Sequence, residues 1–396
     1  MSAPLLLDLT HTSHTRARTG VQRVARSLHA ALGPRALAVT HDPHAGAWRP
    51  LQDWEAANLA ATGAAHRRSA QWPLAAKLRG RAQRWLGRGT GPTARLSHVN
   101  AAGLIVPEIF SPAVAAALPA LFAATRGPRV ALFHDAIALK FPELTPARTV
   151  ARFPSYLHEL LGFDGIAAVS EDSRDSLIEY WRWLGVHTAP PVQAIPLGVE
   201  IGGNALRDLP PPGARPTVLC VGSIEGRKNH VALLEACEQL WARGATFELR
   251  LVGLAQPATG RAALARLRAL QAAGRPLRYD GPLDDREVDE AYAASAFTVY
   301  PSMLEGFGLP VLESLAHGRP CICSARGALG ESARGGGCVA LDAVDAAHLA
   351  PAIDRLLTEP GALAALAAAA RDRPLRTWSN HANELLGWMK TLPRRS

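Results

Sequence analysis

The stretch YPSMLEGFGLPVLESLAHGRP, from Tyr300 to Pro320, places Glu305 and Glu313 on either side of a glycine-rich turn. The apolar AFTVYPS that leads into it predicts a β-strand, MLEGFG predicts a turn, and a helix is predicted from about Leu309. The proline at the start of that helix suits a first helical turn, where its missing N–H costs nothing. A helix start with bare glycine amides, at the carboxyl end of a parallel strand, favours an anion. The stretch therefore predicts a parallel α/β fold with a ligand site at this strand end.

Two carboxylates beside a phosphate site suggest a ligand that also carries hydroxyl groups. On one straight helix, residues eight positions apart would lie about 12 Å apart and about 80° around the axis, too far apart to hold one small group together. With Glu305 in the turn and Glu313 in the helix, one carboxylate could hold a transferred sugar and the other a ribose. The alternative is that Glu305 is a solvated turn residue and Glu313 offsets the helix dipole. For two isolated glutamates at this spacing, that alternative would be the more common one.

Outward from this stretch, apolar strands alternate with helical segments over the whole chain, as in parallel α/β proteins. Its 396 residues favour two domains. The segment IGGNALRDLPPPGARP separates the two series, so we predict a domain over 1–199, a linker over 200–216 and a domain over 217–376. We expect the helix in 377–396 to pack back on the first domain. The predicted strands are LLLDL, GLIVPEIF, RVALFHD, GIAAVS and QAIPLGVE, then TVLCVG, FELRLVG, LRYDG, AFTVYPS and PCICS.

A second motif, VGSIEGRKNH at Val221–His230, lies between the strand TVLCVG and a helix. Gly222 ends the strand, Ser223 follows it directly, and Arg227 and Lys228 stand in the loop. Two fixed cations can stabilise a departing nucleoside diphosphate without a metal, because Arg offers a bidentate fork and Lys a point charge. The alternative for an isolated Arg-Lys pair is a solvated surface turn.

Together, EGFGLPVLESLAHGRP and the Arg-Lys loop resemble the EX7E signature of retaining glycosyltransferases with the GT-B fold, in family four (group 1). The resemblance is strong over 217–325, moderate over 128–200 and weak over 35–105. It implies two facing Rossmann-like domains with parallel sheets. It also implies that Glu305 lies against the donor sugar and that Glu313 binds the nucleotide ribose.

The resemblance further implies which other residues serve the reaction. The expected catalytic residues are Glu305, His134, Arg227 and Lys228. The expected donor-binding residues are Gly20, Gly222, Ser223, Arg227, Lys228, Gly306, Phe307, Gly308, Leu309 and Glu313.

The N-terminal half contributes two of these expectations. His134 and Asp135 follow the strand RVALF, and His134 is expected near the donor sugar with Asp135 orienting its imidazole. Gly20 opens a helix with apolar positions at helical spacing and resembles the glycine-containing first loop of the family, which approaches the donor phosphates. The alternative for His134 is a purely structural histidine, and the alternative for the segment around Gly20 is a basic surface loop.

The net positive charge is concentrated in the N-terminal half. Of a formal net charge of +9, residues 1–199 carry 21 Lys and Arg against 13 Asp and Glu. Residues 56–107 hold eight basic residues and no acidic one, interleaved with Trp and Leu. The part of this segment over 67–95 could rest on anionic lipid, or it could be a loop-rich face of the acceptor domain. Nucleic-acid binding is disfavoured, because aromatic content is 6% and no known module is present.

These patterns predict a retaining, metal-independent hexosyltransferase that moves a sugar from a nucleoside diphosphate donor to a saccharide or lipid-linked saccharide, in surface polysaccharide synthesis. GDP-mannose is the favoured donor; a UDP-hexose or deoxysugar donor, or a non-catalytic basic nucleic-acid-binding protein, are the alternatives. No DxD motif occurs, and no resident cofactor is expected. The start MSAPLLLDLT predicts a strand rather than a signal peptide, and the five cysteines predict small buried side chains. We therefore expect a cytoplasmic protein, with peripheral contact at the inner membrane face as an option.

Overall fold

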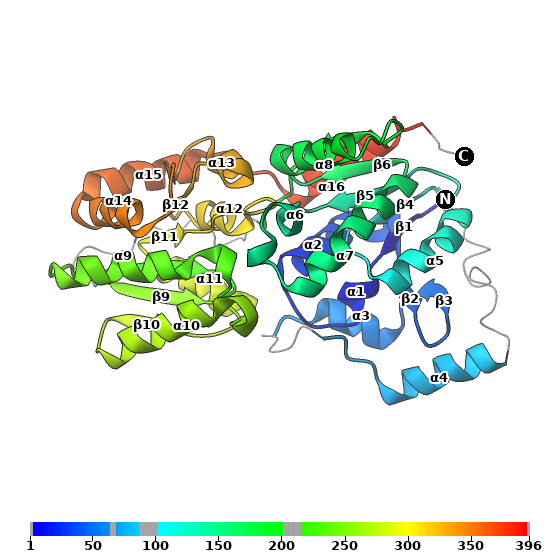
Figure 1. The fold of residues 1–396 in the computed structure, drawn as a ribbon, viewed down its shortest axis with the longest axis horizontal. Coiled ribbons are helices and arrows are strands. Elements are labelled where there is room, and N and C mark those ends of the chain that lie inside the picture. Colours follow the sequence, from blue (N-terminus) through cyan, green and yellow to red (C-terminus); the bar gives the residue numbers. More distant parts are fainter. Residues whose placement is uncertain (1–2, 64–68, 87–100, 201–208, 210–214, 394–396) are drawn as a thin grey trace.

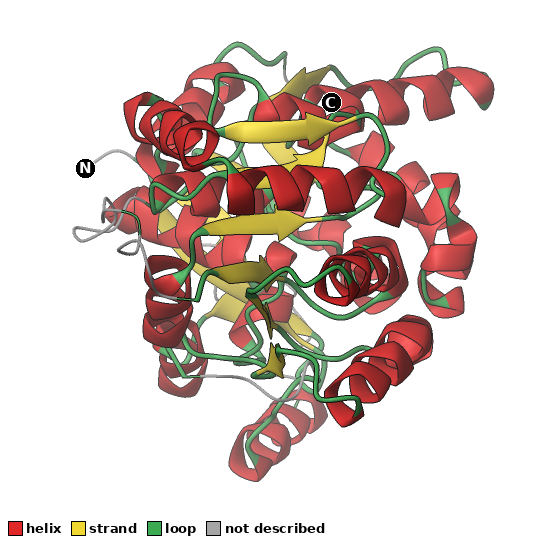
Figure 2. Cartoon of the chain, turned by 90° about the vertical axis from the view of Figure 1, so that its left-hand side faces the viewer, coloured by secondary structure: helices red, strands yellow, loops and turns green. Residues whose placement is uncertain are grey.

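The computed structural model describes residues 3–63, 69–86, 101–200, 209 and 215–393, and it contains two sheets that lie side by side (Figure 1). We call the part built on the first sheet the N-terminal lobe and the part built on the second sheet the C-terminal lobe. Helices cover both sides of the strands, as the view turned by 90° shows (Figure 2). The predicted two-sheet α/β architecture is confirmed.

The N-terminal lobe alternates strands and helices from β1 to β7. Its elements are β1 (Leu5–Asp8), α1 (Thr10–Ser13), α2 (Gly20–Leu32), β2 (Ala36–Asp42), β3 (Ala47–Pro50), α3 (Asp53–Ala60), α4 (Leu74–Trp85), β4 (Gly103–Val106), α5 (Pro112–Ala123), β5 (Arg129–Phe133), α6 (Ile137–Lys140), α7 (Ala147–Glu159), β6 (Gly165–Ala168), α8 (Glu171–Trp183) and β7 (Val192–Ala194). Short 3-10 turns occupy Gly33–Arg35, Pro142–Leu144 and Leu160–Gly162.

The C-terminal lobe repeats the alternation from β8 to α15. Its elements are β8 (Thr217–Val221), a 3-10 turn (Gly226–Lys228), α9 (His230–Ala242), β9 (Glu248–Val252), α10 (Pro257–Ala272), β10 (Leu277–Tyr279), α11 (Asp285–Ala294), β11 (Phe297–Tyr300), α12 (Leu309–Ala316), β12 (Cys321–Ser324), α13 (Gly327–Ala333), β13 (Cys338–Leu341), α14 (Ala346–Thr358) and α15 (Pro360–Asp372). The chain then continues into α16 (Trp378–Met389).

Strand order places a switch point in each sheet. The first sheet runs β3-β2-β1-β4-β5-β6-β7 and the second β10-β9-β8-β11-β12-β13. All neighbouring pairs are parallel except β2 and β3, so β3 is an antiparallel edge strand. The order reverses between β1 and β4 and between β8 and β11, and ligands of doubly wound sheets bind at the carboxyl ends of strands at such points.

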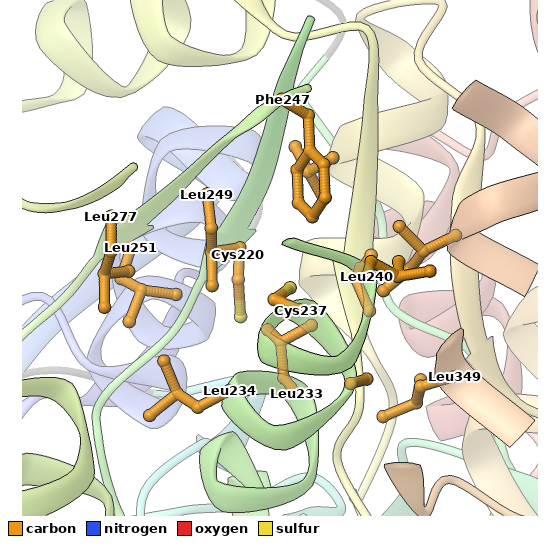
Figure 3. Close-up of a cluster of buried hydrophobic side chains, with 14 of the residues drawn as sticks. Cys220, Leu233, Leu234, Cys237, Leu240, Phe247, Leu249, Leu251, Leu277 and Leu349 are labelled. Atoms are coloured by element: carbon orange, nitrogen blue, oxygen red, sulfur yellow. The ribbon is translucent and has the colours of Figure 1, made fainter. Parts of the chain in front are cut away.

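The strands form where short apolar runs can be buried by helices on both faces. In the C-terminal lobe, Phe247, Leu249 and Leu251 from the β9 region meet Leu233 and Cys237 from α9 (Figure 3). Fully burying one large apolar side chain contributes about 1.5–3 kcal/mol relative to exposure, so this cluster holds β9 and α9 together. Cysteine serves here as a small apolar residue: Cys220, Cys237, Cys321 and Cys323 are buried, and Cys338 is partly exposed.

The last helix returns to the N-terminal lobe. Trp378, Leu385 and Met389 of α16 share one buried cluster with Leu7 and Val24, and α16 lies against α2. A parallel bridge between Val199 and Thr377 brings the chain back before α16 begins. The linker predicted over 200–216 falls largely outside the described residues.

Some local expectations differ from the structure. The strands β2, β3 and β13 were not among those predicted, although β2 contains the apolar run ALAV and β13 is the apolar run CVAL. The predicted strand GLIVPEIF ends at Val106, since Pro107 has no N–H to continue the ladder. Ser170 caps the N-terminus of α8, because its side chain accepts a hydrogen bond from the amide of Ser173 at 3.1 Å.

Candidate active site

The candidate site lies where β8 and β11 end, at the switch point of the second sheet. The two strands pair in parallel, so the loop after Val221 and the turn after Tyr300 leave the same edge of the sheet. The two loops are tied together, because the amide of Met303 donates to the carbonyl of Arg227 at 2.9 Å. The Arg227 guanidinium in turn donates to the Leu304 carbonyl at 3.2 Å. Two segments far apart in the sequence thus form one rigid unit.

Glu305 is at the centre of this unit. Its carboxylate pairs with Arg227 at 2.7 Å and with Lys228 at 2.5 Å. The hydroxyl groups of Tyr300 and Ser302 also donate to it, at 2.9 and 2.5 Å. Burial by itself would raise the pKa of Glu305, but Arg227 and Lys228 outweigh it and hold the pKa at about 2. The carboxylate is therefore ionised at neutral pH.

The two cations differ in how firmly they keep their charge. Burial lowers the pKa of Lys228, although the nearby Glu305 opposes that effect. Burial also disfavours the charged Arg227, but Glu305 and Glu225 more than offset it and its pKa is raised. Arg227 pairs with Glu225 at 2.8 Å as well. The loop thus presents a fixed guanidinium and a buried ammonium, balanced here by carboxylates that an incoming phosphate could replace in part.

Gly306 is required where the turn meets the N-terminal lobe. A Cβ at this position would lie 2.0 Å from the carbonyl oxygen of His134, closer than any real contact. The hydroxyl of Ser173 on α8 lies 2.9 Å from the same oxygen and 3.3 Å from the Gly306 carbonyl oxygen. The backbone after β5 therefore packs directly on the turn that carries Glu305.

The His134 imidazole points to its own lobe. Its Nε2 lies 2.7 Å from the Pro107 carbonyl, which can accept its proton, and burial lowers the pKa of the ring, so the ring is neutral. The sequence suggested that Asp135 orients the His134 imidazole, but the structure shows no hydrogen bond between these two described residues. The Asp135 carboxylate accepts from the amide of Ile137 at 3.0 Å instead.

The start of α12 combines strain with packing across the lobes. Gly308 has φ of +102°, which favours glycine, and a Cβ there would lie 3.0 Å from the Leu329 side chain. The Ser332 hydroxyl donates to the Phe307 carbonyl at 2.6 Å. Phe307 and Leu309 pack against the cluster that holds β1, α2 and α16, so they serve the joint between the lobes.

Glu313 lies in a separate network from Glu305. It forms an ion pair with Arg23 of α2, and the Tyr292 hydroxyl lies 3.4 Å from its other oxygen. Glu313 raises the pKa of Arg23. A second pair crosses in the same region, between Arg18 and Asp285 at 2.7 Å. The glutamate expected to hold a ribose is thus held by the opposite lobe in this structure.

The remaining expected donor residues lie at strand and helix ends. Gly20 is exposed at the first position of α2, and a Cβ there would meet nothing within 4 Å. Gly222 lies against the Tyr300 ring, 3.6 Å from where its Cβ would be. Ser223, the next residue, is partly exposed. Neither glycine is required by packing alone.

Several contributors were not among the expected residues. Tyr300 and Ser302 stand in the stretch quoted at the start, and polar groups at the end of a strand and directly after it could have indicated them. Tyr292, Ser173 and Glu331 come from other elements. The Glu331 carboxylate of α13 accepts from the amides of Glu171 and Asp172 at 3.0 and 2.8 Å, capping α8 across the lobes. No local signal marks such a partner.

The two doubly wound parallel sheets in tandem are the architecture of the GT-B fold. Residues 204–373 match the family described as Glycosyl transferases group 1. The matched segment is similar to that family and contains both the loop with Arg227 and Lys228 and the turn with Glu305.

Curated relatives match about half of this chain. It is 29% identical over 203 residues to the serotype-specific mannosyltransferase WbdA of Escherichia coli, covering 48% of this chain and 25% of WbdA. It is 36% identical over 179 residues to the D-inositol 3-phosphate glycosyltransferase of Rhodococcus jostii, covering 43% of this chain and 39% of the relative. With the O-antigen chain mannosyltransferase B of Escherichia coli, it shares 28% identity over 207 residues, 49% of this chain and 52% of the relative. The chain thus spans between a quarter and about half of these relatives.

Solved structures match over nearly the full length. Sucrose-phosphate synthase from Thermosynechococcus elongatus aligns with a TM-score of 0.66 and 19% identity, covering 98% of each chain. Anabaena Alr3699/HepE, solved with UDP and glucose, aligns with a TM-score of 0.69 and 14% identity, covering 98% of this chain and 100% of that one. At these identities the likeness concerns the fold.

Proposed function

We propose that the protein is a retaining glycosyltransferase that moves a hexose from a nucleoside diphosphate sugar to a hydroxyl of a saccharide or lipid-linked saccharide. The observation that carries the proposal is the grouping of Arg227, Lys228 and Glu305 at the ends of β8 and β11. The group lies within the segment that matches the family and at the switch point where such sheets bind ligands.

Each residue has a role that its surroundings support. Arg227 and Lys228 bind the diphosphate and stabilise its charge as it departs, which makes a metal unnecessary. Glu305, ionised and held by four partners, positions the sugar and stabilises positive charge at the anomeric carbon. Glu313 binds the ribose, in place of or together with its pair to Arg23. His134 supports the site through its backbone, whose carbonyl oxygen packs on Gly306 next to Glu305.

Retention of configuration follows from attack on the same face of the sugar as departure. The leaving phosphate then accepts the proton of the acceptor hydroxyl. Arg227 and Lys228 support this step, because fixed cations on the leaving group lower the barrier to its departure without removing its capacity to take the proton.

Mannose from GDP-mannose is the favoured donor, because two of the relatives are named mannosyltransferases. A UDP-hexose is the second candidate, since HepE was solved with UDP and glucose. Surface polysaccharide synthesis is the setting we propose, because one of these mannosyltransferases is named for the O-antigen chain.

The test separates donor binding from turnover. A donor at a hundred times its Kd stabilises the folded state by about 2.7 kcal/mol by mass action and so raises the melting temperature. A thermal-shift series over GDP-mannose, UDP-glucose and a deoxysugar nucleotide therefore identifies the base and the sugar that bind. Lys228→Ala should weaken the shift, whereas the exposed Arg286→Ala should leave it unchanged. Glu305→Gln should retain binding of the nucleoside diphosphate and lose turnover.

Product analysis completes the test. The anomeric proton of the product should keep the donor's configuration, and activity should persist in a chelator. Unchanged turnover in both Lys228→Ala and Glu305→Gln would defeat the assignment of the site.

A further inference from the structure

The helix α4 exposes large apolar side chains to solvent. Leu74 is 72% exposed, Leu78 56%, and Trp85 86%; the following Leu86 is 55% exposed. Figure 1 shows α4 at the outer margin of the N-terminal lobe, away from the C-terminal lobe. Such a density of exposed large apolar side chains on one short helix marks an interaction surface rather than ordinary surface.

The exposed side chains form one stripe. At about 100° per residue, Leu74, Leu78 and Trp85 fall within about 40° of each other around the helix. The buried residues Ala76 and Gly80 lie on roughly the opposite side. The stripe therefore faces away from the protein.

Close packing holds α4 in this orientation. A Cβ at Gly80 would lie 2.8 Å from the His44 Cβ and 3.3 Å from a carboxylate oxygen of Asp42. The small buried face is thus seated directly on the turn that follows β2. Rotating the helix to bury the leucines would bring large side chains against that turn.

Positive charge flanks the stripe. Lys77, Arg79, Arg81 and Arg84 lie on the same helix, and no acidic residue occurs between Glu55 and Glu108 in the sequence. Within the part of the chain that the structure describes, no carboxylate forms an ion pair with these four cations.

A hollow adjoins the exposed tryptophan. Its volume is about 320 Å³, and its lining consists of Pro43, His44, Arg81, Arg84 and Trp85. Two guanidinium groups beside an apolar ring match a phosphate head group whose acyl chains continue along the leucines.

We infer that the exposed face of α4 binds the surface of an anionic lipid bilayer. An apolar stripe bordered by cations suits the head-group boundary, where the leucines and tryptophan enter the acyl region and the cations meet lipid phosphates. A second copy of the chain is a poorer partner, because it would set four cations against four cations. Binding here deepens the proposed function by bringing the enzyme to a lipid-borne acceptor, yet it does not depend on the donor site.

The test measures sedimentation of the full chain with vesicles of phosphatidylcholine alone and with about 30% phosphatidylglycerol. We expect binding to the anionic vesicles that weakens with added salt, and a loss on the order of tenfold or more in Leu78→Gln/Trp85→Gln and in Arg81→Gln/Arg84→Gln. The matched control is Trp183→Gln, because Trp183 is 79% exposed at the end of α8 and should leave binding unchanged. All variants alter exposed side chains, so melting temperature and the donor-induced shift should stay at wild-type values.

Three outcomes would overturn the inference. Equal vesicle binding by the wild type and by Leu78→Gln/Trp85→Gln would show that the apolar stripe does not bind the bilayer. A concentration-dependent dimer that the same variant abolishes would assign the face to self-association. Tight binding of duplex DNA that the arginine variant loses, with no vesicle binding, would assign it to nucleic acid. Since donor-induced stabilisation is read separately, each of these results leaves the proposed function standing.

Discussion

Replacing Glu305 by Gln removes the negative charge that balances two buried or half-buried cations. In the wild type, Arg227 and Lys228 lower the pKa of this carboxyl from 4.5 to about 2 despite its burial. A difference of about 2.5 pKa units corresponds to about 3 kcal/mol by which the folded state favours the ionised form. We therefore expect Glu305→Gln to lower the free energy of unfolding by about 3 kcal/mol at pH 7.

The pH dependence follows from the sign of this difference. Because the folded pKa is depressed, the stabilisation is present in full above the unfolded pKa of about 4.5 and is lost as pH falls through about 2. At pH 3 the wild type should retain only about 1.5 kcal/mol of it. The gap in stability between wild type and Glu305→Gln should shrink accordingly.

Urea unfolding at pH 7 and pH 3 measures this gap. Glu290→Gln is the matched control, because Glu290 pairs with Arg286 at an exposed site and should cost no more than about 1 kcal/mol at either pH. A nucleoside diphosphate should stabilise Glu305→Gln at least as much as wild type, since it supplies the anion that the variant lacks. Equal losses in Glu305→Gln and Glu290→Gln, or a gap that does not change with pH, would refute this account of the site.

Three further predictions concern the contacts between the lobes and the loop before α2. Gly306→Ala should lower both the melting temperature and the turnover, because the added Cβ would lie 2.0 Å from the His134 carbonyl oxygen. Calorimetry and a turnover assay measure the two effects, and wild-type values of both would contradict the prediction. Gly20→Ala should keep the melting temperature, since nothing lies within 4 Å of the added carbon, while raising KM for the donor if the loop approaches phosphate; an unchanged KM would exclude that approach. Glu331→Ala should lower the free energy of unfolding by about 0.5–2 kcal/mol, because it removes the carboxylate that accepts from the amides of Glu171 and Asp172. Chemical denaturation measures this loss, and a loss no larger than that of an exposed glutamate without such contacts would contradict the prediction.

The sequence by itself determined most of the strands and their order along the chain, although β2, β3 and β13 were missed. Apolar runs, helical spacing and the positions of glycine and proline are local properties, and they located β8, β11 and the turn at Glu305 correctly. Once two parallel strands are neighbours, the residues that follow them must meet, so the grouping of Arg227, Lys228 and Glu305 was within reach of sequence reasoning.

Only the tertiary structure decided the partners that come from the other lobe. Arg23 and Glu313 are 290 positions apart, and the carbonyl of His134 meets Gly306 through backbone alone, which no side-chain pattern records. The exposed stripe of α4 likewise depends on which face of the helix Gly80 seats against the turn after β2. The physical reason is the same in each case: local sequence fixes the backbone of an element, whereas the partner of a side chain depends on how whole elements pack.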